Sequence, residues 1–587
     1  MRTAQPLRDR RHARAPLHIA LIIAALLVSP FARAANIKVE ITGLDEALDV
    51  NARAHLSLVS YAAVPDLNET NIRAMHARAP AELRAALVPF GYYAPEIESS
   101  LTLQDGTWVA HYDVKPGEPV LVTAVDFRID GDGASEPGLE AVLDASTVKE
   151  GAVLRHDEYE RTRDALLAKS LELGYRDAQL TERRIEVDPA QRTARLILHL
   201  ETGPRYRFGE ISFEQDALRP DVLQRYVHFE PGDPYDAKKL LDLQYGLYDS
   251  EYYSAVEIAP GEPVGDSVPI TVRAQPRGRH SYRVGLGYGT DTRARVSLGW
   301  ADRRVNTRGH RAAVDLTLSE PKQDIEAQYS IPIRNPVTDS RALALHQLDE
   351  DLGDTHTSKI ELIARETRQL GQWQRQLYVG LADEQSDVSD EVIDSTQLVP
   401  GTLWTRTHGN DPINPTRGTF LGADLHGSGT ALGADTDFVR LRLDGHLLHP
   451  LWGRGRLITR ATLGVSYVEE LDRLPTSERF FAGGDQSVRG FDLNSLGPVD
   501  EDGDVVGGRY LLTASVEYAY PIRGPWSIAV FVDGGNAFDH WGDPLEYGAG
   551  IGARYRTPLG MLRVDIAEPL TEGDDGIHFH FAFGPEL

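Results

Sequence analysis

The sequence contains no cysteine among its 587 residues. A chain without thiols forms no disulfide, holds no iron–sulfur cluster, offers no thiolate ligand to zinc and has no cysteine nucleophile. Long apolar runs are also missing, since no stretch reaches the roughly 18 apolar residues that a helix needs to cross a bilayer. Basic residues are too few, at 61 Lys and Arg against 88 Asp and Glu, for the basic surface of a general nucleic-acid binder.

Catalytic motifs are absent as well. There is no Walker loop, no G-x-S-x-G elbow and no H-E-x-x-H motif. Residues 548–553 fit the loose pattern G-x-G-x-x-A, but a dinucleotide fingerprint needs a helix after it, and Arg554 to Pro558 follow instead. We interpret this segment as a strand of small residues. Asp500, Asp502 and Asp504 are followed by valine where a calcium loop needs glycine. We therefore expect no enzyme activity, no cofactor and no bound metal.

The first 34 residues have the pattern of a secretory signal peptide. A basic stretch of five arginines precedes an apolar stretch at 17–28, which is too short to span a membrane as a helix. Ala32-Arg33-Ala34 then supplies a small-x-small cleavage site. The sequence predicts export, and a cysteine-free exported chain suits the bacterial cell envelope. The alternative is a buried or anchoring helix.

Residues 37–276 contain a repeat of about 80 residues, in the size range of structural repeats. Each copy is predicted to run strand, helix, helix, strand, strand, although the first copy shows only one helical stretch, near 81–88. Gly151 and Gly232 hold the same position in the second and third copies, and Gly-Tyr pairs precede the second strand of the first two. The predicted units are 35–117, 118–203 and 204–276. Chance similarity among small α+β units is the alternative interpretation.

Residues 277–587 show almost only alternation of apolar and polar residues. Leu512, Ala514 and Val516, for example, alternate with Thr513 and Ser515. About sixteen such strands fit this part, as in a transmembrane barrel with an apolar outer face and a polar lumen. A soluble two-sheet sandwich would alternate too. The membrane is favoured by aromatic residues near the predicted strand ends, as in an interfacial girdle: Tyr288, Trp300, Tyr329, Trp404, Tyr518, Trp526 and Tyr555.

The most specific motif lies in a long segment between two predicted strands, residues 469–508. This segment contains Val488-Arg489-Gly490-Phe491, and a second motif, Phe531-Val532-Asp533-Gly534-Gly535-Asn536, lies on a later predicted strand. With the three repeats, these motifs resemble the outer-membrane assembly superfamily, which joins POTRA domains to a 16-stranded barrel. In that superfamily the Val-Arg-Gly-Phe segment is the tip of a loop folded back into the lumen.

The resemblance implies that Arg489 pairs with an inward-facing Asp533. A lumenal arginine between protein walls needs a carboxylate, and a fork-shaped pair fixes its orientation. Gly490 permits the sharp turn at the tip, between Val488 and Phe491. Without the flanking motifs, Arg489 would be interpreted as a solvated loop arginine.

Within the superfamily, the three repeats and the ending Gly584-Pro585-Glu586-Leu587 look most like the TamA family, the outer-membrane subunits of the translocation and assembly module. The predicted fold is a 16-stranded transmembrane antiparallel β-barrel after three periplasmic α+β POTRA domains. The resemblance implies a Gram-negative outer membrane, with the POTRA domains in the periplasm. It also implies a TamB-type inner-membrane-anchored partner, contact with outer-membrane lipid, and unfolded autotransporter-like clients that the protein helps to insert or secrete.

A weak seam between the first and last barrel strands is the predicted route for client strands. Glycines in the first strand weaken its packing. The seam is assigned to Val284, Gly285, Leu286, Gly287, Phe579, Phe581 and Phe583. Two other functions stay open: a transport conduit, meaning a two-partner-secretion exporter or a lipid-conducting bridge, and a large periplasmic β protein.

Overall fold

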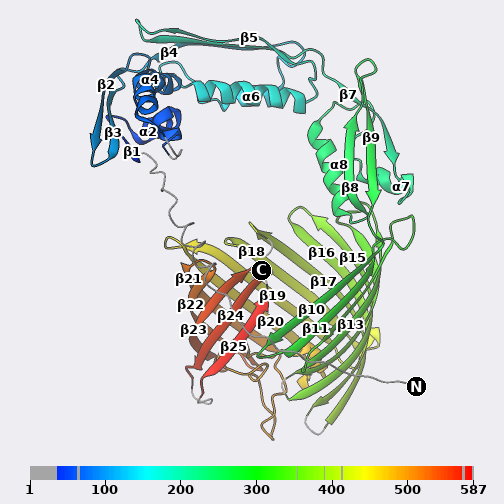
Figure 1. Cartoon of the computed structure of the whole chain (residues 1–587). Helices are drawn as coiled ribbons and strands as arrows, with labels where there is room; N and C mark the ends of the chain where they lie inside the picture. The colour runs from blue at the N-terminus through cyan, green and yellow to red at the C-terminus, as the bar shows by residue number, and fades with distance from the viewer. Residues whose placement is uncertain are drawn as a thin grey trace, which may run out of the picture. The chain divides into compact units, whose positions relative to one another are not determined.

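The computed structural model describes residues 36–62, 67–352, 354–388, 391–411, 414–558, 560–571 and 576–584 (Figure 1). The predicted signal peptide at 1–34 lies outside the described residues. The chain forms two compact units, one of residues 1–207 with 232–237 and 265–267, the other of the remaining residues up to 587. Among the described residues, no helix combines the length and apolarity needed to cross a membrane.

The first unit begins with a three-stranded sheet of order β1-β3-β2, in which β1 is parallel and β2 antiparallel to β3. Ile72 and Leu83 from the longest helix pack with Tyr112 of the central strand in a buried core. Pro80 lies inside that helix, of which only the last part, near 81–88, was predicted. The elements are β1 (Asn36–Thr42), α2 (Glu46–His55), α3 (Ser57–Ser60), α4 (Glu69–Leu87), η1 (Val88–Phe90), β2 (Glu96–Gln104) and β3 (Thr107–Lys115).

The same unit continues with a second sheet of order β4-β6-β5, built in the same way. Its core joins Leu139 and Leu166 of the two helices to Leu196 and Leu198 of the central strand. The elements follow the predicted order strand, helix, helix, strand, strand: β4 (Leu121–Asp130), α5 (Pro137–Asp144), α6 (His156–Glu172), β5 (Gln179–Asp188) and β6 (Thr193–Glu201).

A third sheet, of order β7-β9-β8, precedes the barrel. The first of its two predicted helices is short and divides into one α-helical and one 3-10 turn. The elements are β7 (Arg207–Glu214), α7 (Pro220–Leu223), η2 (Gln224–Tyr226), α8 (Ala237–Asp249), β8 (Tyr253–Pro260) and β9 (Ser267–Pro276).

This third module is fastened to the barrel within the second unit. The Tyr252 hydroxyl donates to the Gly309 carbonyl at 2.5 Å. Arg311 of the barrel donates from Nη2 to the Ser250 carbonyl at 2.7 Å, and its guanidinium lies 4.8 Å from the centre of the Tyr252 ring. These contacts tie the residues just after α8 to the connection between the second and third barrel strands.

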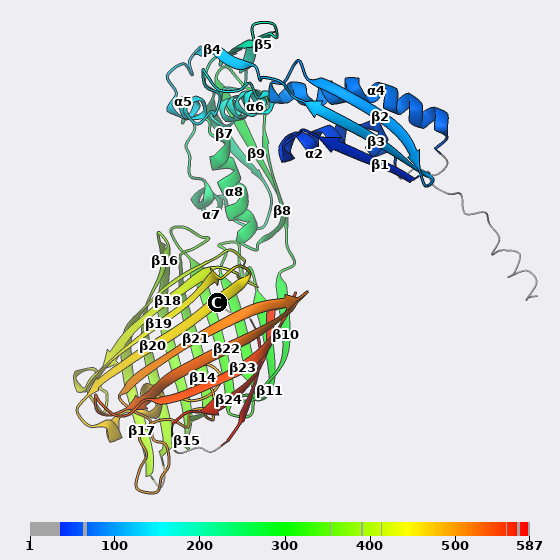
Figure 2. The same cartoon turned by 90° about the vertical axis from the view of Figure 1, so that its left-hand side faces the viewer.

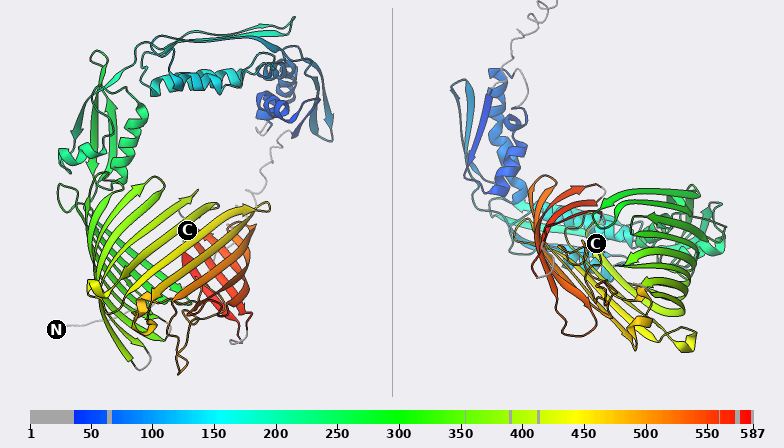
Figure 3. Two further views of the ribbon diagram at one scale, coloured as in Figure 1. Left: turned by 180° about the vertical axis from the view of Figure 1, so that it is seen from behind. Right: turned by 90° about the horizontal axis from the view of Figure 1, so that it is seen from below.

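The barrel is a single 16-stranded antiparallel sheet running in chain order from β10 to β25 (Figures 2 and 3). Its strands are β10 (His280–Gly289), β11 (Arg293–Asp302), β12 (Arg311–Leu318), β13 (Lys322–Pro332), β14 (Ser340–Leu352), β15 (Thr355–Leu370), β16 (Trp373–Val388), β17 (Glu391–Gly409), β18 (Gly418–Ser428), β19 (Phe438–Leu451), β20 (Gly455–Val468), β21 (Tyr510–Arg523), β22 (Trp526–Phe538), β23 (Glu546–Thr557), β24 (Gly560–Pro569) and β25 (His578–Gly584).

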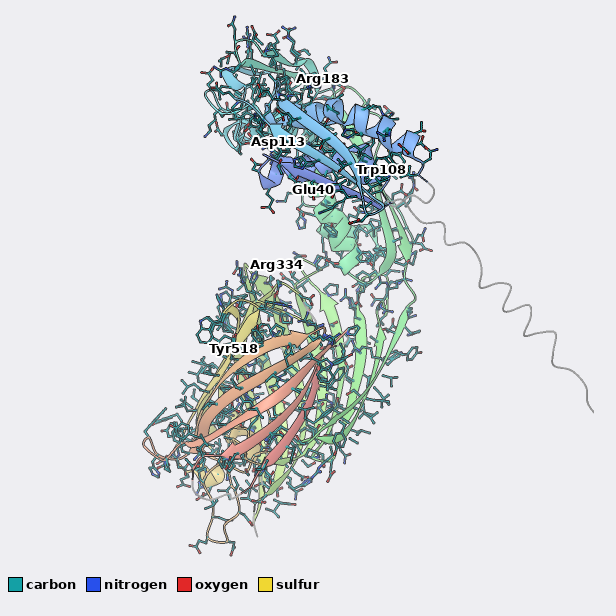
Figure 4. All side chains as sticks on the ribbon, turned by 60° about the vertical axis from the view of Figure 1, so that its left-hand side comes forward. Glu40, Trp108, Asp113, Arg183, Arg334 and Tyr518 are labelled. Carbon is teal, nitrogen blue, oxygen red and sulfur yellow. The ribbon has the colours of Figure 1, made fainter. Side chains whose placement is uncertain are left out.

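Alternation along each strand separates an apolar outer face from a polar lumen. On β21, Val516 is 53% exposed, whereas the next residue, Glu517, is 5% exposed. Tyr518, labelled in Figure 4, packs against the exposed Trp452 with ring centres 5.5 Å apart. A half-exposed apolar face along every strand is stable only against lipid, which confirms the predicted membrane β fold.

Candidate functional site: the inserted loop and the seam

The connection between β20 and β21, residues 469–509, is called the inserted loop here because most of its central residues are buried. It contains two short 3-10 turns, η4 (Leu471–Arg473) and η5 (Thr476–Glu478). In the predicted tip motif, Val488, Arg489 and Phe491 are 0%, 2% and 6% exposed. Gly490 has φ of +103°, which side chains with a Cβ rarely adopt, so glycine is required at the turn.

The tip places Arg489 against Asp533, the residue with which it was predicted to pair. Nε and Nη2 of Arg489 donate to the two carboxylate oxygens of Asp533 at 2.7 and 2.9 Å. The backbone N–H of Arg489 also donates to Asp533, at 3.1 Å. Asp533 is fully buried, and the guanidinium carbon lies 3.4 Å from the centre of the Phe531 ring. This fork-shaped pair fixes both the position and the orientation of the tip.

Arg489 and Asp533 belong to a larger buried network. Nη1 of Arg489 also donates to Glu517 at 2.8 Å and to Asp565 at 3.2 Å. Arg554, which is fully buried, donates to the same two carboxylates at 2.6–2.9 Å. The Arg489 side chain is therefore bonded to three strands, β21, β22 and β24, and its ion pairs join two arginines to three carboxylates.

The glycines of β23 make room for the tip. A Cβ on Gly548 would lie 1.9 Å from the carbonyl oxygen of Arg489. A Cβ on Gly552 would lie 1.8 Å from Asp565 and 2.6 Å from Arg554. Residues 548–553, which fit the loose dinucleotide pattern, lie on β23, as the sequence indicated. Glycines at 548 and 552 leave the space that Arg489, Arg554 and Asp565 occupy.

A second part of the inserted loop is anchored to other strands. Glu478, which is 5% exposed, lies 2.7 Å from Nε2 of His426 on β18. Its carboxylate also lies 3.7 Å from the Lys359 ammonium on β15 and 3.9 Å from Nε of Arg440 on β19. The neighbouring Ser477 donates from its backbone N–H and its hydroxyl to Glu384 on β16. The loop thus bridges two groups of barrel strands.

The seam between β10 and β25 differs from every other strand boundary. Ladders of seven or more residue pairs join each strand to the next from β10 through β25. Within the described residues, no such ladder joins β25 back to β10. The Thr290 N–H donates to the Phe581 carbonyl at 3.4 Å, the Phe581 N–H donates to the Thr290 hydroxyl at 3.2 Å, and Tyr288 lies beside the Phe581 ring.

The seam contacts involve only some of the residues assigned to the seam. Counting antiparallel register from Thr290 and Phe581 puts Phe583 opposite Tyr288, whereas Phe579 falls beyond the end of β10. By the same count, Gly287 falls opposite Gly584, and Val284, Gly285 and Leu286 have no described residue opposite them. Val284 and Leu286 are 73% and 78% exposed.

Sequence reasoning missed most of the residues around Arg489 and all the partners of Glu478. Glu517 and Asp565 alternate with apolar neighbours on β21 and β24, and a charged residue at mid-strand was the available signal. Nothing in the sequence assigned either of them to Arg489, because the choice depends on how far the loop reaches into the lumen. In the described part of the chain, no group of three or more His, Asp or Glu side chains is placed to hold a metal ion.

Comparisons with protein families match three parts of the chain. Residues 278–586 match the Omp85 superfamily domain. Residues 38–116 match the first POTRA domain of TamA, and residues 206–277 match the surface antigen variable number repeat, a POTRA model.

Among curated proteins, the chain is 26% identical over 392 residues to the outer membrane protein assembly factor BamA of Nitratidesulfovibrio vulgaris, covering 62% of this chain and 49% of that protein. It is 23% identical over 472 residues to BamA of Neisseria meningitidis serogroup B, covering 67% and 58%. The chain thus spans about half the length of the curated relatives it matches. The crystal structure of BamA from Haemophilus ducreyi lacking POTRA domains 1–3 superposes with a TM-score of 0.65 at 18% identity, covering 78% of this chain and 99% of that one.

Proposed function

Because the chain belongs to the Omp85 superfamily, we propose that it is a non-enzymatic factor that inserts or secretes client proteins at the outer membrane. Members of this superfamily are outer-membrane β-barrels with periplasmic POTRA domains, and this chain shares that location. The observation that carries the proposal is the seam. A sheet edge without a ladder offers free backbone donors and acceptors to an incoming strand.

The proposed mechanism is strand addition at the seam. A client strand would pair with the edge of β10 or β25, and the barrel would then release it sideways into lipid. Among the described residues, the hydrogen bonds and the ring contact between β25 and this edge lie at the end of β10, at Tyr288 and the following Thr290, and no ladder joins the rest of β10 to β25. The three POTRA modules would hold the client or a partner protein in the periplasm, through the edge strands of their sheets.

A cysteine lock in register with the seam tests the proposal. The native chain has no cysteine, so Tyr288→Cys with Phe583→Cys creates one defined pair. The matched control is Ala327→Cys with Leu345→Cys, which are paired on β13 and β14, where a ladder already exists. We expect oxidation of the seam pair to block insertion of a client barrel into vesicles, and reduction to restore it. Insertion that continues with the seam locked would refute strand addition there.

We further propose that the protein acts in the manner of the TamA family, with a TamB-type partner anchored in the inner membrane. Support comes from the family match at residues 38–116 and from the number of POTRA modules. The test is a photo-crosslinking residue at Leu103, which is 58% exposed on the edge strand β2, with Leu171, 50% exposed on α6, as the control position. A TamB-type protein captured at position 103 and not at 171 supports the pairing, and equal capture at both positions contradicts it.

A further inference from the structure

The inserted loop touches both edges of the seam, and these contacts are separate from the Arg489 network. Asp291 lies in the turn between β10 and β11, and its carboxylate accepts the backbone N–H of Asp485 at 2.7 Å. His580 lies on β25, is 4% exposed, and its Nε2 faces the backbone N–H of Gly490 at 3.1 Å. One short stretch of the loop therefore holds the first hairpin and the last strand together.

The two edge residues also face each other. Nδ1 of His580 lies 3.9 Å from the carboxylate of Asp291. Because Gly490 N–H is a donor, Nε2 of His580 must accept, and the ring proton of the neutral imidazole then resides on Nδ1, which is turned toward the Asp291 carboxylate. The loop, the first hairpin and the last strand thus meet at this point, with His580 bonded to the loop and facing Asp291 at a distance too long for a hydrogen bond.

The loop backbone is shaped for these contacts. Gly483 and Gly484 both have positive φ, at +105° and +93°. A Cβ on Gly484 would lie 2.6 Å from the Asp291 carboxylate oxygen. The close approach that lets the Asp485 N–H reach Asp291 thus depends on a glycine directly before it.

Direct contacts across the seam are few by comparison. Among the described residues, the hydrogen bonds made directly across the seam are the two between Thr290 and Phe581, beside the packing of the Tyr288 ring and the approach of His580 to Asp291. The loop supplies about as many hydrogen bonds between the two edges as the edges supply to each other. It joins the edges from inside the lumen.

We propose that the inserted loop is a latch on the seam, with Asp291 and His580 as the positioning residues that receive it. Withdrawal of residues 485–490 then frees both edges at once, and the seam opens. The inference deepens the proposed function by naming what controls access to the seam, but its test requires no client.

The experiment measures seam opening in the full chain, reconstituted in lipid nanodiscs without client. Spin labels on Leu286→Cys of β10 and Ile566→Cys of β24, both exposed, report the distance across the seam by double electron–electron resonance. Asp291→Ala and His580→Phe remove the acceptors, and we expect each to lengthen and broaden the distance distribution. Asp291→Asn and His580→Gln keep an acceptor oxygen and are expected to stay close to wild type.

The matched control is Asp315→Ala. Asp315 binds Arg283 of β10 at 2.6 Å on the same wall, and the described contacts do not connect it to the loop. We expect this variant to leave the distance unchanged. If Asp291→Ala or His580→Phe prevents folding, Gly484→Ala perturbs the same contact from the loop side and should also open the seam.

Unchanged seam distances in the folded acceptor-removing variants would overturn the latch, as would equal opening by Asp315→Ala. The outcome is distinct from that of the proposed function. If the seam opens in these variants but the cysteine lock does not block client insertion, the latch is supported and strand addition at the seam is refuted. If the lock blocks insertion but the seam stays closed in the variants, strand addition is supported and the latch is refuted.

Discussion

Replacement of Arg489 by alanine is expected to cost far more stability than replacement of its partner Asp533. The ion pairs around Arg489 join two arginines to three carboxylates, a net charge of −1 among the groups that pair directly. Arg489→Ala leaves one arginine among three buried carboxylates, a net charge of −2. Asp533→Ala leaves two arginines with two carboxylates, which is neutral. The two substitutions therefore have opposite effects on the electrostatic balance.

The magnitudes follow from what each variant leaves unpaired. Without Arg489, the fully buried Asp533 loses both donors of its fork and the backbone bond, and such a broken buried pair costs about 3–5 kcal/mol. Without Asp533, Arg489 keeps Glu517 and Asp565, so the loss is about 2 kcal/mol, the value of a charged hydrogen bond. The double variant has no orphaned Asp533, and we expect it to cost about 4 kcal/mol, with a coupling of about 2 kcal/mol.

The assay is urea unfolding of the protein in detergent micelles, followed by the fraction that still migrates as the compact species on an unheated gel. Arg442→Ala serves as the control, because Arg442 pairs with Asp444 at a half-exposed position where an ion pair contributes about 0–1 kcal/mol. Equal losses for Arg489→Ala and Asp533→Ala, with full additivity in the double variant, would show that the two residues do not act as a pair.

Three further predictions concern other parts of the molecule. Glu478→Ala leaves Lys359, His426 and Arg440 without their loop carboxylate and should lower barrel stability in the same assay by about 3 kcal/mol, with Glu478→Gln costing less. Gly548→Ala should push the loop tip away from β23 and lower barrel stability by about 1–3 kcal/mol. The control Gly445→Ala should cost little, because the nearest atom to its added Cβ lies at an ordinary 3.8 Å. Equal costs for the two variants would show that the loop tip does not need the space at Gly548. Burial lowers the pKa of His156, which contacts the Tyr93 hydroxyl at 2.9 Å, so its contribution to stability is full above the unfolded pKa of about 6.5 and is lost as the pH falls below it. Hydrogen exchange of α6 should therefore speed up between pH 7 and pH 5 after correction for intrinsic rates, and His156→Gln should flatten that dependence.

The sequence predicted the architecture well because alternation and turn spacing are local properties. The strands of the barrel and the order within each repeat follow from residues close in the chain. The helices of the first repeat were less visible, because Pro80 interrupts the pattern inside α4. The pairing of Arg489 with Asp533 came from resemblance, and Glu517, Asp565 and His580 became partners only once a lumenal loop was placed among distant strands.

The contacts of the inserted loop imply an order in which the barrel loses structure. Ladders of at least seven residue pairs hold the strands at both loop anchors, around Glu478 and around Arg489, so those strands stay paired if the loop leaves. The seam has no ladder among the described residues. Its two edges are instead joined through the loop, which binds Asp291 on one edge and His580 on the other. Weakening an anchor therefore acts first on the seam, although neither anchor lies in it. Arg489→Ala should accordingly lengthen the distance between labels at 286 and 566 at urea concentrations where the compact species is still intact. Seam opening that coincides with global unfolding would show that the anchor and the seam are not coupled through the loop.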